Sequence, residues 1–541
     1  MNQSPENKRK FNPFLPIWIS LVLIFGVFIG TLFNFKSGNN IIIKKNNTKS
    51  SKLENVLEFI TQNYVDTIDA DSLRDMTLVA MLHSLDPHSD YISAKELSTV
   101  NEPLQGNFDG IGVEFNILND TITVVNPING GPSEKAGIQS GDKIIKVNGA
   151  LVAGIKITNK QVFSTLRGER GTKVNIQIKR NGLTKLLDFT IMRGEIPIYS
   201  VDAGYMLTAT TGYIKISRFG ATTYKEYLSA FNNLKKQGMK KMIIDLRGNG
   251  GGYLNAAVDI TDEFLNKGMR IVYTQGQASP RREYKASDRG GYENDPLAIL
   301  IDEGSASASE ILAGAVQDND RAILVGRRTF GKGLVQEQME MLDGSAIRLT
   351  TARYYTPTGR CIQKPYNKGN AAYYEEEFNR YETGELLQED SIKISNNVKY
   401  KTPSGKIVYG GGGITPDYFV GIDTTYRSYW LTRIAYAGFL SDFSLEEVDK
   451  NRQAFQKYKT TTAFISEFIV TDDRINKFIS YCEKNGINKD EKSIKKGKEY
   501  LKTQLKALIG RNLFGNEAYY PISQKNDPSI AKALEVLEKQ N

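Results

Sequence analysis

The chain has 541 residues, of which 40% are hydrophobic and 24% are charged, a composition that excludes a mainly disordered or collagen-like protein. At roughly 100–200 residues per domain, this length predicts three or four units. The net charge is +9, but residues 1–52 hold +7 of it, which argues against a nucleic-acid-binding domain with a basic face. Histidine is the usual general base and metal ligand, yet only His83 and His88 are present. Cys361 and Cys482 are too far apart for a zinc site or a disulfide framework. From these low counts of histidine and cysteine we expect no metal, no cofactor and a chemistry that does not depend on histidine.

Residues 14–35 form a long apolar segment. At about 1.5 Å per residue it matches the ~30 Å hydrocarbon thickness of a bilayer. A basic cluster at residues 8–10 precedes it, and the apolar run is longer than that of a cleaved signal peptide. We therefore predict a single-pass, uncleaved signal anchor, with residues 1–13 in the cytoplasm and residues 36–51 as a solvated linker. A cleaved signal peptide is the alternative, and the lysines on both sides leave the orientation undecided by charge alone.

Residues 52–97 have apolar side chains at helical spacing and predict a helical segment. This pattern stops at Leu85-Asp86-Pro87-His88, since the residue before a proline is disfavoured in a helix. We interpret His83 and His88 as structural residues at a helix end and turn, because no second cluster of metal ligands is visible.

Residues 98–193 change to a period of two, which predicts β-strands such as 110–115 and 121–125. The run A-G-I-x-x-G-D-x-I-x-x-V-N-G at residues 136–149 resembles a PDZ domain. In that family a glycine-rich loop binds the C-terminal carboxylate of a peptide, which adds to the sheet edge as a strand. The resemblance assigns this loop to Gly110, Ile111, Gly112 and Val113.

Residues 194–425 alternate between strand and helix patterns, which indicates sheet and helix layers packed together. We expect strands at 213–216, 242–246 and 297–301 and helices at 223–236, 253–266 and 306–317.

Two turns rich in small residues follow strands of this region. The sequence D-L-R-G-N-G-G-G at 245–252 can direct successive backbone N–H groups at an anion, although a plain tight turn fits as well. It is not a dinucleotide fingerprint, because the third glycine would fall on Tyr253. The sequence G-S-A-S-A-S-E at 304–310 would leave a nucleophilic serine accessible, and spacing does not choose among its three serines. Alternatively, Ser307 and Glu310 have the spacing of a helix capping box.

A third segment, G-R-R-T-F-G-K-G at 326–333, nearly matches a phosphate-binding loop. That loop needs a Mg²⁺-binding hydroxyl at the position of Gly333 and a helix after it. Residues 334–339 fit a strand at least as well as they fit a helix, so both features argue against a phosphate-binding loop. Lys332 lies between two glycines. If buried, its pKa would fall and the neutral amine could act as a general base; a surface lysine in a turn is the alternative.

These segments together resemble the C-terminal processing peptidases, or tail-specific proteases, over residues 52–425. The resemblance rests on motifs in family order: L-D-P-H-S, the PDZ signature, D-L-R-G-N-G-G-G, G-S-A-S-A-S-E, T-F-G-K-G-x-V-Q and G-G-G-I-T-P-D. The family consists of serine peptidases with a Ser–Lys dyad, usually preceded by a PDZ domain. It implies the following roles here: nucleophile Ser307, general base Lys332, lysine-orienting Gln336, and oxyanion donors Ala308 and one glycine of 250–252, with Gly252 preferred and Gly251 second.

We therefore expect an α/β multidomain protein, with a PDZ domain at 98–193, a peptidase core at 194–425 and a C-terminal helical extension at 426–541. The expected function is endoproteolysis of protein C-terminal regions on the periplasmic or extracytoplasmic side of the inner membrane; a catalytically inactive PDZ scaffold is the alternative. Expected partners are proteins or peptides with accessible C-termini, the membrane and an adaptor, but no nucleic acid. Residues 364–408 form an insert that we expect to be a solvated elaboration, with a partner surface or a lid as alternatives.

Overall fold

The computed structural model describes residues 52–392 and 398–539, in two compact units, residues 1–74 and 75–541. The described part of the first unit comprises α2, Lys52–Asn63, and the start of α3, Ala70–His83. The predicted anchor at 14–35 and linker at 36–51 lie outside the described residues. Within the described ranges, no helix combines the length and the apolar character that a bilayer crossing requires.

The second unit begins with the rest of α3, the short strand β1, Asp90–Ile92, and α4, Ala94–Gln105. The expected change from helix to strand at residue 98 is wrong, because α4 continues to Gly106, whose φ of +81° ends it as a left-handed cap. The strand β1 was also missed, since it forms by pairing with β18, Ala346–Tyr355, far along the chain.

The next region contains a small β-sheet with the strand order β3-β4-β5-β7-β8, in which β6 pairs with β5. Its strands enclose an aliphatic core with Ile122, Val124, Ile144 and Val174 at its centre. The predicted strand at 110–115 is broken, because Gly112 has a φ of +74° and separates β2 from β3. The elements are β2 Asn107–Gly110, β3 Val113–Leu118, β4 Thr121–Pro127, α5 Pro132–Ala136, β5 Lys143–Val147, β6 Ala150–Leu151, α6 Asn159–Leu166, β7 Lys173–Lys179, β8 Leu187–Met192 and β9 Gly194–Pro197.

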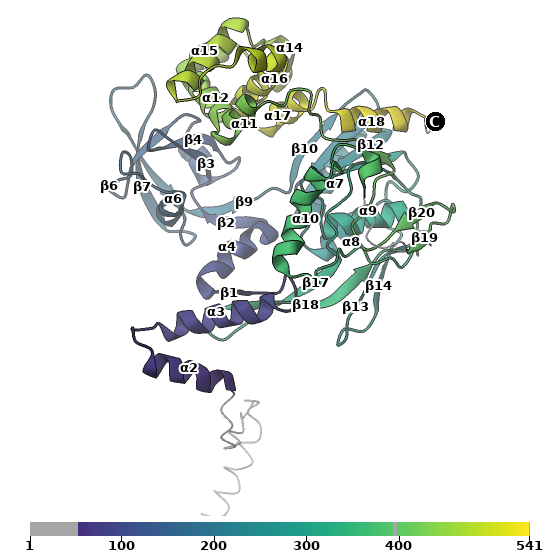
Figure 1. Ribbon diagram of the computed structural model, residues 1–541. Coiled ribbons are helices and arrows are strands. Elements are labelled where there is room, and N and C mark those ends of the chain that lie inside the picture. Colours follow the sequence, from purple (N-terminus) through teal and green to yellow (C-terminus); the bar gives the residue numbers. More distant parts are fainter. Residues whose placement is uncertain (1–51, 393–397, 540–541) are drawn as a thin grey trace, which may run out of the picture. The chain divides into compact units, whose positions relative to one another are not determined.

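A larger sheet of order β10-β11-β12-β15-β16-β21 forms the centre of the following region; β10 is antiparallel to β11 and the other pairs are parallel. Helices α7, α8 and α9 pack on one face (Figure 1). The other face is covered by α18, Pro528–Glu538, near the far end of the chain, through Ile530, Ala533 and Leu537. The remaining bounds are β10 Val201–Met206, β11 Thr211–Ile216, α7 Thr223–Lys236, β12 Lys241–Asp245, α8 Leu254–Asp262, β15 Leu297–Ile301, α9 Ala308–Asp318, β16 Ile323–Gly326 and β21 Tyr418–Phe419.

A further sheet has the order β1-β18-β13-β14, with β17 on β18, and its Arg353, on β18, donates to the hydroxyl of Tyr366 in the insert at 3.0 Å. The expectation that residues 364–408 are a solvated elaboration is wrong for helix α10, Asn370–Glu382, because Tyr373 and Arg380 on it are buried. The bounds are β13 Arg270–Gln275, β14 Arg282–Lys285, β17 Leu334–Glu340, η1 Glu389–Ser391, β19 Lys399–Lys401 and β20 Ile407–Tyr409.

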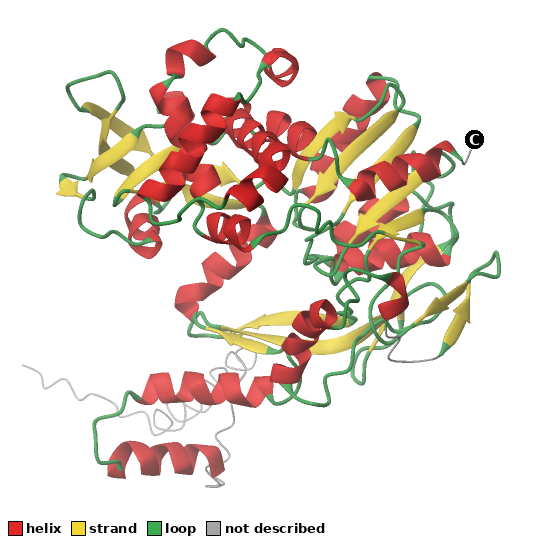
Figure 2. Ribbon diagram, turned by 45° about the horizontal axis from the view of Figure 1, so that its top comes forward, coloured by secondary structure: helices red, strands yellow, loops and turns green. Residues whose placement is uncertain are grey.

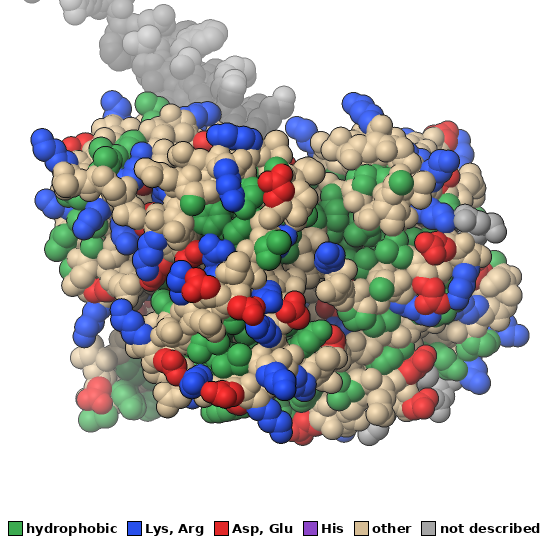
Figure 3. Space-filling view, turned by 90° about the horizontal axis from the view of Figure 1, so that it is seen from above, with side chains coloured by type: hydrophobic (Ala, Val, Ile, Leu, Met, Phe, Trp, Pro, Cys, Tyr) green, Lys and Arg blue, Asp and Glu red, His purple; other side chains and the backbone are tan. Residues whose placement is uncertain are grey.

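The C-terminal region is helical, as predicted (Figure 2), and has a hydrophobic core of its own. Aromatic and aliphatic side chains such as Trp430, Phe464, Phe478, Leu501 and Leu505 build this core, separate from that of the small β-sheet. On the face shown in Figure 3, Lys and Arg side chains alternate with Asp and Glu instead of forming one positive area. The helices are α11 Tyr429–Tyr436, α12 Phe439–Lys450, α13 Arg452–Phe455, α14 Thr461–Glu467, α15 Asp472–Lys484, α16 Glu491–Phe514 and α17 Asn516–Ser523.

Candidate active site

Two of the predicted turns meet at the carboxyl end of the large sheet. Strands β12 and β15 are parallel neighbours, so the turns that follow them leave the sheet at the same edge. Ser305 Oγ donates to the carbonyl of Leu246 at 2.8 Å, and Ser309 Oγ donates to that of Asn249 at 2.8 Å. Both hydroxyls are buried and hold the turns together. Of the three serines that spacing could not separate, only Ser307 is partly exposed.

Ser307 immediately precedes helix α9 and has an unusual backbone conformation, with φ 55° and ψ −113°. A positive φ at a residue with a side chain is strained and persists only where surrounding contacts enforce it. The nearest enforcing contact is the Glu310 carboxylate, which accepts from the N–H of Ser307 at 2.9 Å. The predicted capping relation between these residues is therefore present at a serine whose side chain is partly exposed.

Glu310 also holds the loop that carries Lys332. Its carboxylate accepts from the N–H groups of Lys332 at 2.9 Å and Gly331 at 2.8 Å, and from Thr329 Oγ1 at 2.5 Å. The carboxyl group is fully buried, and burial raises its pKa against the effect of these hydrogen bonds. One carboxylate thus joins the backbones of Ser307 and Lys332.

Tyr354, on β18, makes a second bridge between the same two residues. Its hydroxyl donates to the carbonyl of Lys332 at 2.7 Å and lies 3.1 Å from the carbonyl of Ser307. The ring is buried, so the bridge is shielded from water. Neither Glu310 nor Tyr354 was predicted as a site residue, because each role depends on contacts between distant segments.

Burial lowers the pKa of Lys332, and the positive charge of Arg348 lowers it further, while Asp86 and Glu310 act in the opposite direction. The neutral amine therefore forms at a lower pH than that of a free lysine. Lys332 is partly buried, and its role as a general base stays a prediction.

Gln336 lies on β17, and its side-chain amide donates to Thr350 Oγ1 at 3.2 Å. Thr350 in turn donates to Asp86 Oδ1 at 3.1 Å, and Ser89 Oγ donates to Asp86 Oδ2 at 2.6 Å. The L-D-P-H-S segment is therefore connected by hydrogen bonds to the predicted site, which spacing along the chain did not reveal.

His88 lies in this neighbourhood too, with Nε2 3.0 Å from the hydroxyl of Tyr373 in the insert. Burial, followed by the nearby charge of Lys332, lowers the pKa of His88 to about 3. The imidazole is neutral at physiological pH, which agrees with the predicted structural role. The prediction placed His88 only at a helix end and turn, and did not include its position beside the candidate site.

The insert, residues 364–408, is hydrogen-bonded to the loop that carries Lys332, residues 327–333. The guanidinium of Arg380 donates to the carbonyls of Arg328, Thr329 and Phe330 at 3.3, 2.9 and 3.0 Å. Arg380 is itself held by Glu376 at 2.8 Å. The insert is thus part of the framework of the predicted site.

The predicted oxyanion donors differ in how free their N–H groups are. The N–H of Gly251 donates to Asn249 Oδ1 at 2.9 Å, so it is already occupied. Gly252 forms a parallel bridge with Phe219 through the flanking groups, Gly251 C=O and Tyr253 N–H, which leaves its own N–H pointing away from this partner. A side chain at Gly251 would come within 2.7 Å of Ser307 Cβ. Gly251 therefore lies against Ser307 but has an occupied N–H group, whereas the N–H of Gly252 is not used in the bridge to Phe219.

The predicted carboxylate loop lies between β2 and β3. The carbonyls of Ile111 and Gly112 accept from Ser133 and Ile128, so these carbonyls are directed into the domain. Strand β3 is an edge strand of its sheet, and among the described residues only β4 pairs with it.

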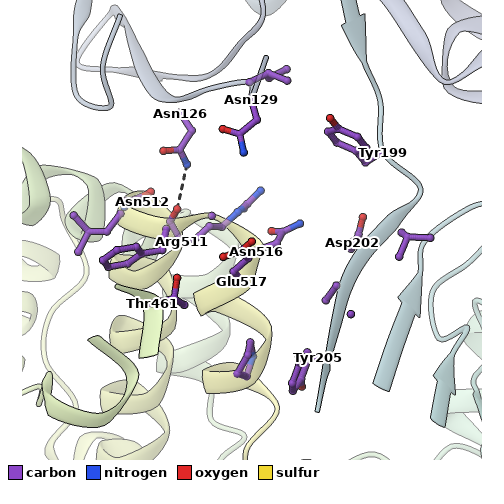
Figure 4. A pocket seen from close by; sticks show the side chains of 18 of the residues that line it. Asn126, Asn129, Tyr199, Asp202, Tyr205, Thr461, Arg511, Asn512, Asn516 and Glu517 are labelled. Atoms are coloured by element: carbon purple, nitrogen blue, oxygen red, sulfur yellow. Dashed lines mark hydrogen bonds between the residues drawn. The ribbon is translucent and has the colours of Figure 1, made fainter. Parts of the chain in front are cut away.

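A cavity of about 1490 Å³ lies among β10, the turn at Asn126–Asn129 and the corner between α16 and α17 (Figure 4). Asn126 donates to the carbonyl of Arg511 across it at 3.2 Å. Ser307 and Lys332 do not line this cavity. Three regions of the chain therefore line this cavity.

Within residues 52–392 and 398–539, no group of three or more His, Cys, Asp or Glu side chains is arranged to hold a metal ion. Cys361 and Cys482 are both free thiols.

Comparison with known proteins identifies three parts of the chain. Residues 210–369 match peptidase family S41, residues 110–191 match the PDZ domain, and residues 430–515 match a family of unknown function.

Among curated proteins, the chain is 35% identical to the carboxy-terminal processing protease CtpA of Bacillus subtilis over 64% of this chain and 74% of the relative. It is 37% identical to the carboxy-terminal-processing protease of Bartonella bacilliformis over 58% of this chain and 72% of the relative. A solved structure, the photosystem II D1 C-terminal processing protease, shares 25% identity over 68% of this chain and 92% of that chain, with a TM-score of 0.34. The chain belongs to the carboxy-terminal processing proteases, which are serine peptidases of family S41.

Proposed function

We propose that this serine peptidase cleaves the C-terminal regions of proteins through an acyl-enzyme, with Ser307 as nucleophile and Lys332 as general base. The observation that carries the proposal is the double bridge, because Glu310 and Tyr354 each contact the backbones of both residues. The lowered pKa of the partly buried Lys332 supports its role as a base.

In this mechanism the neutral amine of Lys332 takes the proton of Ser307 Oγ as that oxygen bonds to the scissile carbonyl carbon. The N–H groups of Ala308 and Gly252 stabilise the resulting oxyanion, each donor contributing ~3–4 kcal/mol. The protonated lysine then gives its proton to the leaving amine as the C–N bond breaks. A water molecule then attacks the ester as the same lysine takes its proton. When the ester C–O bond breaks and the carboxylic acid leaves, the lysine returns this proton to Ser307 Oγ. Gln336 orients Lys332.

The PDZ domain would capture the carboxylate of the substrate at Gly110, Ile111, Gly112 and Val113. The segment 14–35 would anchor the chain in the inner membrane, with the peptidase on the periplasmic or extracytoplasmic side. This location is tested by adding a proteinase to cells whose protein carries a C-terminal epitope. An extracytoplasmic epitope is digested when only the outer layer of the cell envelope is permeabilised and the inner membrane is intact.

The dyad is tested by cleavage of an unstructured polypeptide by the full chain and by Ser307→Ala and Lys332→Ala. Each variant should lose about three orders of magnitude in kcat/KM, whereas Lys267→Ala, which alters an exposed lysine of the same region, should leave it unchanged. If both dyad variants cut as fast as the parent, the assignment is wrong. A parent that binds C-terminal peptides but never cleaves would favour the inactive scaffold.

The pH dependence tests the base. Because only the neutral amine accepts a proton, kcat/KM should rise with pH through the lowered pKa of Lys332 and fall on acidification. A variant in which His83 and His88 are both replaced by Gln should keep this profile if it remains folded. Loss of activity in that folded variant would count against a lysine base.

A further inference from the structure

A groove of about 730 Å³ runs along the free edge of β3 in the PDZ domain. One wall consists of β3 and of Asn159 and Phe163 on helix α6. The opposite wall comes from the C-terminal helical region, at the turn between α11 and α12, residues 436–442. Two regions separated by about three hundred residues of sequence therefore enclose one groove.

The PDZ wall has the features that bind an extended peptide. An edge strand offers unpaired backbone N–H and C=O groups to an added strand, and pockets for alternate side chains give specificity. Val113, Phe115 and Ile117 alternate along β3 and pack partly against the PDZ core. Phe163 is 44% exposed beside them. The groove therefore fits an apolar C-terminal side chain close to the carboxylate loop.

The charges that line the groove are both negative, at Glu114 and Asp442. Glu114 is neutralised by Arg511 at 2.7 Å. Asp442, in the first turn of α12, is partly buried, and among the described residues no cation or donor pairs with its carboxylate. Its neighbour Glu446 is itself bound to Lys450 at 2.6 Å. Burial and then the charge of Glu446 raise the pKa of Asp442 to about 6, as is typical of a carboxylate that lacks a positive partner.

We propose that the α11–α12 turn is a second wall of the PDZ groove and that Asp442 selects ligands with a Lys or Arg upstream of an apolar C-terminal residue. The inference rests on the proposed capture of C-termini by the PDZ loop. A peptide whose carboxylate lies at residues 110–113 and which pairs with β3 extends about 3.4 Å per residue along the strand. Its upstream side chains then pass the wall that carries Asp442.

The test uses the full chain with Ser307→Ala, so that bound peptides persist, and measures Kd by fluorescence anisotropy. The labelled peptides share one apolar C-terminus and carry a single Lys, or Gln in the control series, moved through the upstream positions. At one or two positions the Lys peptide should bind about two- to five-fold more tightly than its Gln counterpart, as for a partly exposed ion pair. Asp442→Asn should abolish this difference and leave the Kd of the Gln peptide unchanged. Glu483→Gln, which removes an exposed acid on α15, should preserve it.

The outcomes separate the inference from the function on which it rests. A preference for Lys that survives Asp442→Asn, or no preference at any position, overturns the inference while C-terminal capture stands. If peptides with an amidated C-terminus bind as tightly as those with a free carboxylate, and Phe163→Ala raises the Kd of neither kind, then the proposed capture of C-termini by the PDZ loop is wrong. Absence of binding by all peptides overturns both.

Discussion

The predicted catalytic centre and the PDZ groove would contact the same substrate, but they are built in different ways. The catalytic centre is joined by buried groups, since Glu310 and Tyr354 bridge segments from distant parts of the chain. The PDZ groove lies where separate hydrophobic cores meet through polar contacts, such as the ion pair of Arg511 with Glu114. Buried, satisfied networks rigidify a site, whereas polar interfaces between domains allow relative motion. We infer that chemistry requires fixed geometry here, and that recognition tolerates adjustment.

Replacing Glu310 by Ala should have the largest effect. The change removes the acceptor from the N–H groups of Gly331, which is buried, and of Ser307 and Lys332, which are partly buried. A buried group left without a partner costs about 1–3 kcal/mol. We expect the free energy of unfolding to fall by roughly 3 kcal/mol or more and cleavage to be lost. Denaturant titration and peptide cleavage measure these effects. Glu310→Gln, which keeps the acceptor oxygen of an amide, should retain more of both, and an Ala variant as stable as the parent would contradict the bridge.

Replacing Arg380 by Ala should weaken the catalytic centre without touching Ser307 or Lys332. Three carbonyls of the lysine loop lose their donor, and misplacement of a catalytic group is costly. We expect kcat to fall by about tenfold or more, with KM less affected. Arg433→Ala, on an exposed side chain of α11, is the matched control. If kcat for Arg380→Ala stays at the parent value, the insert does not position the lysine loop.

Acid stability should depend on His88. Burial, followed by the charge of Lys332, lowers its folded pKa to about 3 from 6.5, so between these values the unfolded chain binds more protons. Stability from this group is present above pH 6.5 and is lost as the pH falls toward 3. The free energy of unfolding should therefore drop less between pH 7 and pH 5 in His88→Gln than in the parent. Equal drops would mean that His88 titrates normally.

Arg511→Ala should have the smallest effect on stability. The pair with Glu114 is about 40% exposed on both sides, with values of 39% and 41%, and such pairs contribute about 0.2–1 kcal/mol. We expect little change in the melting temperature but faster hydrogen exchange at the PDZ surface that faces α16. A large loss of stability would show that this polar interface is as fixed as the catalytic centre.

Local pattern was sufficient for much of the fold. The helix at 223–236 and the strand at 297–301 have the bounds that the sequence predicted, because the helix has apolar residues at helical spacing and the strand is one continuous apolar run. The helical nature of the C-terminal region and the family were likewise evident in the sequence. The boundary at residue 98 failed, since the cap at Gly106 outweighed the shift in pattern.

The candidate residues Ser307, Lys332 and Gln336 came from the sequence alone, through motifs that are contiguous in the chain. The family resemblance selected Ser307 among three serines that spacing alone could not separate, and the tertiary structure added a physical reason, because Ser305 and Ser309 are buried and hydrogen-bonded. Only the tertiary structure revealed the roles of Glu310, Tyr354 and Arg380, whose partners lie on other segments. Sequence determined which groups are present in each turn. The long-range contacts, made when parallel strands bring these turns to one sheet edge and the insert packs behind them, decided which groups meet.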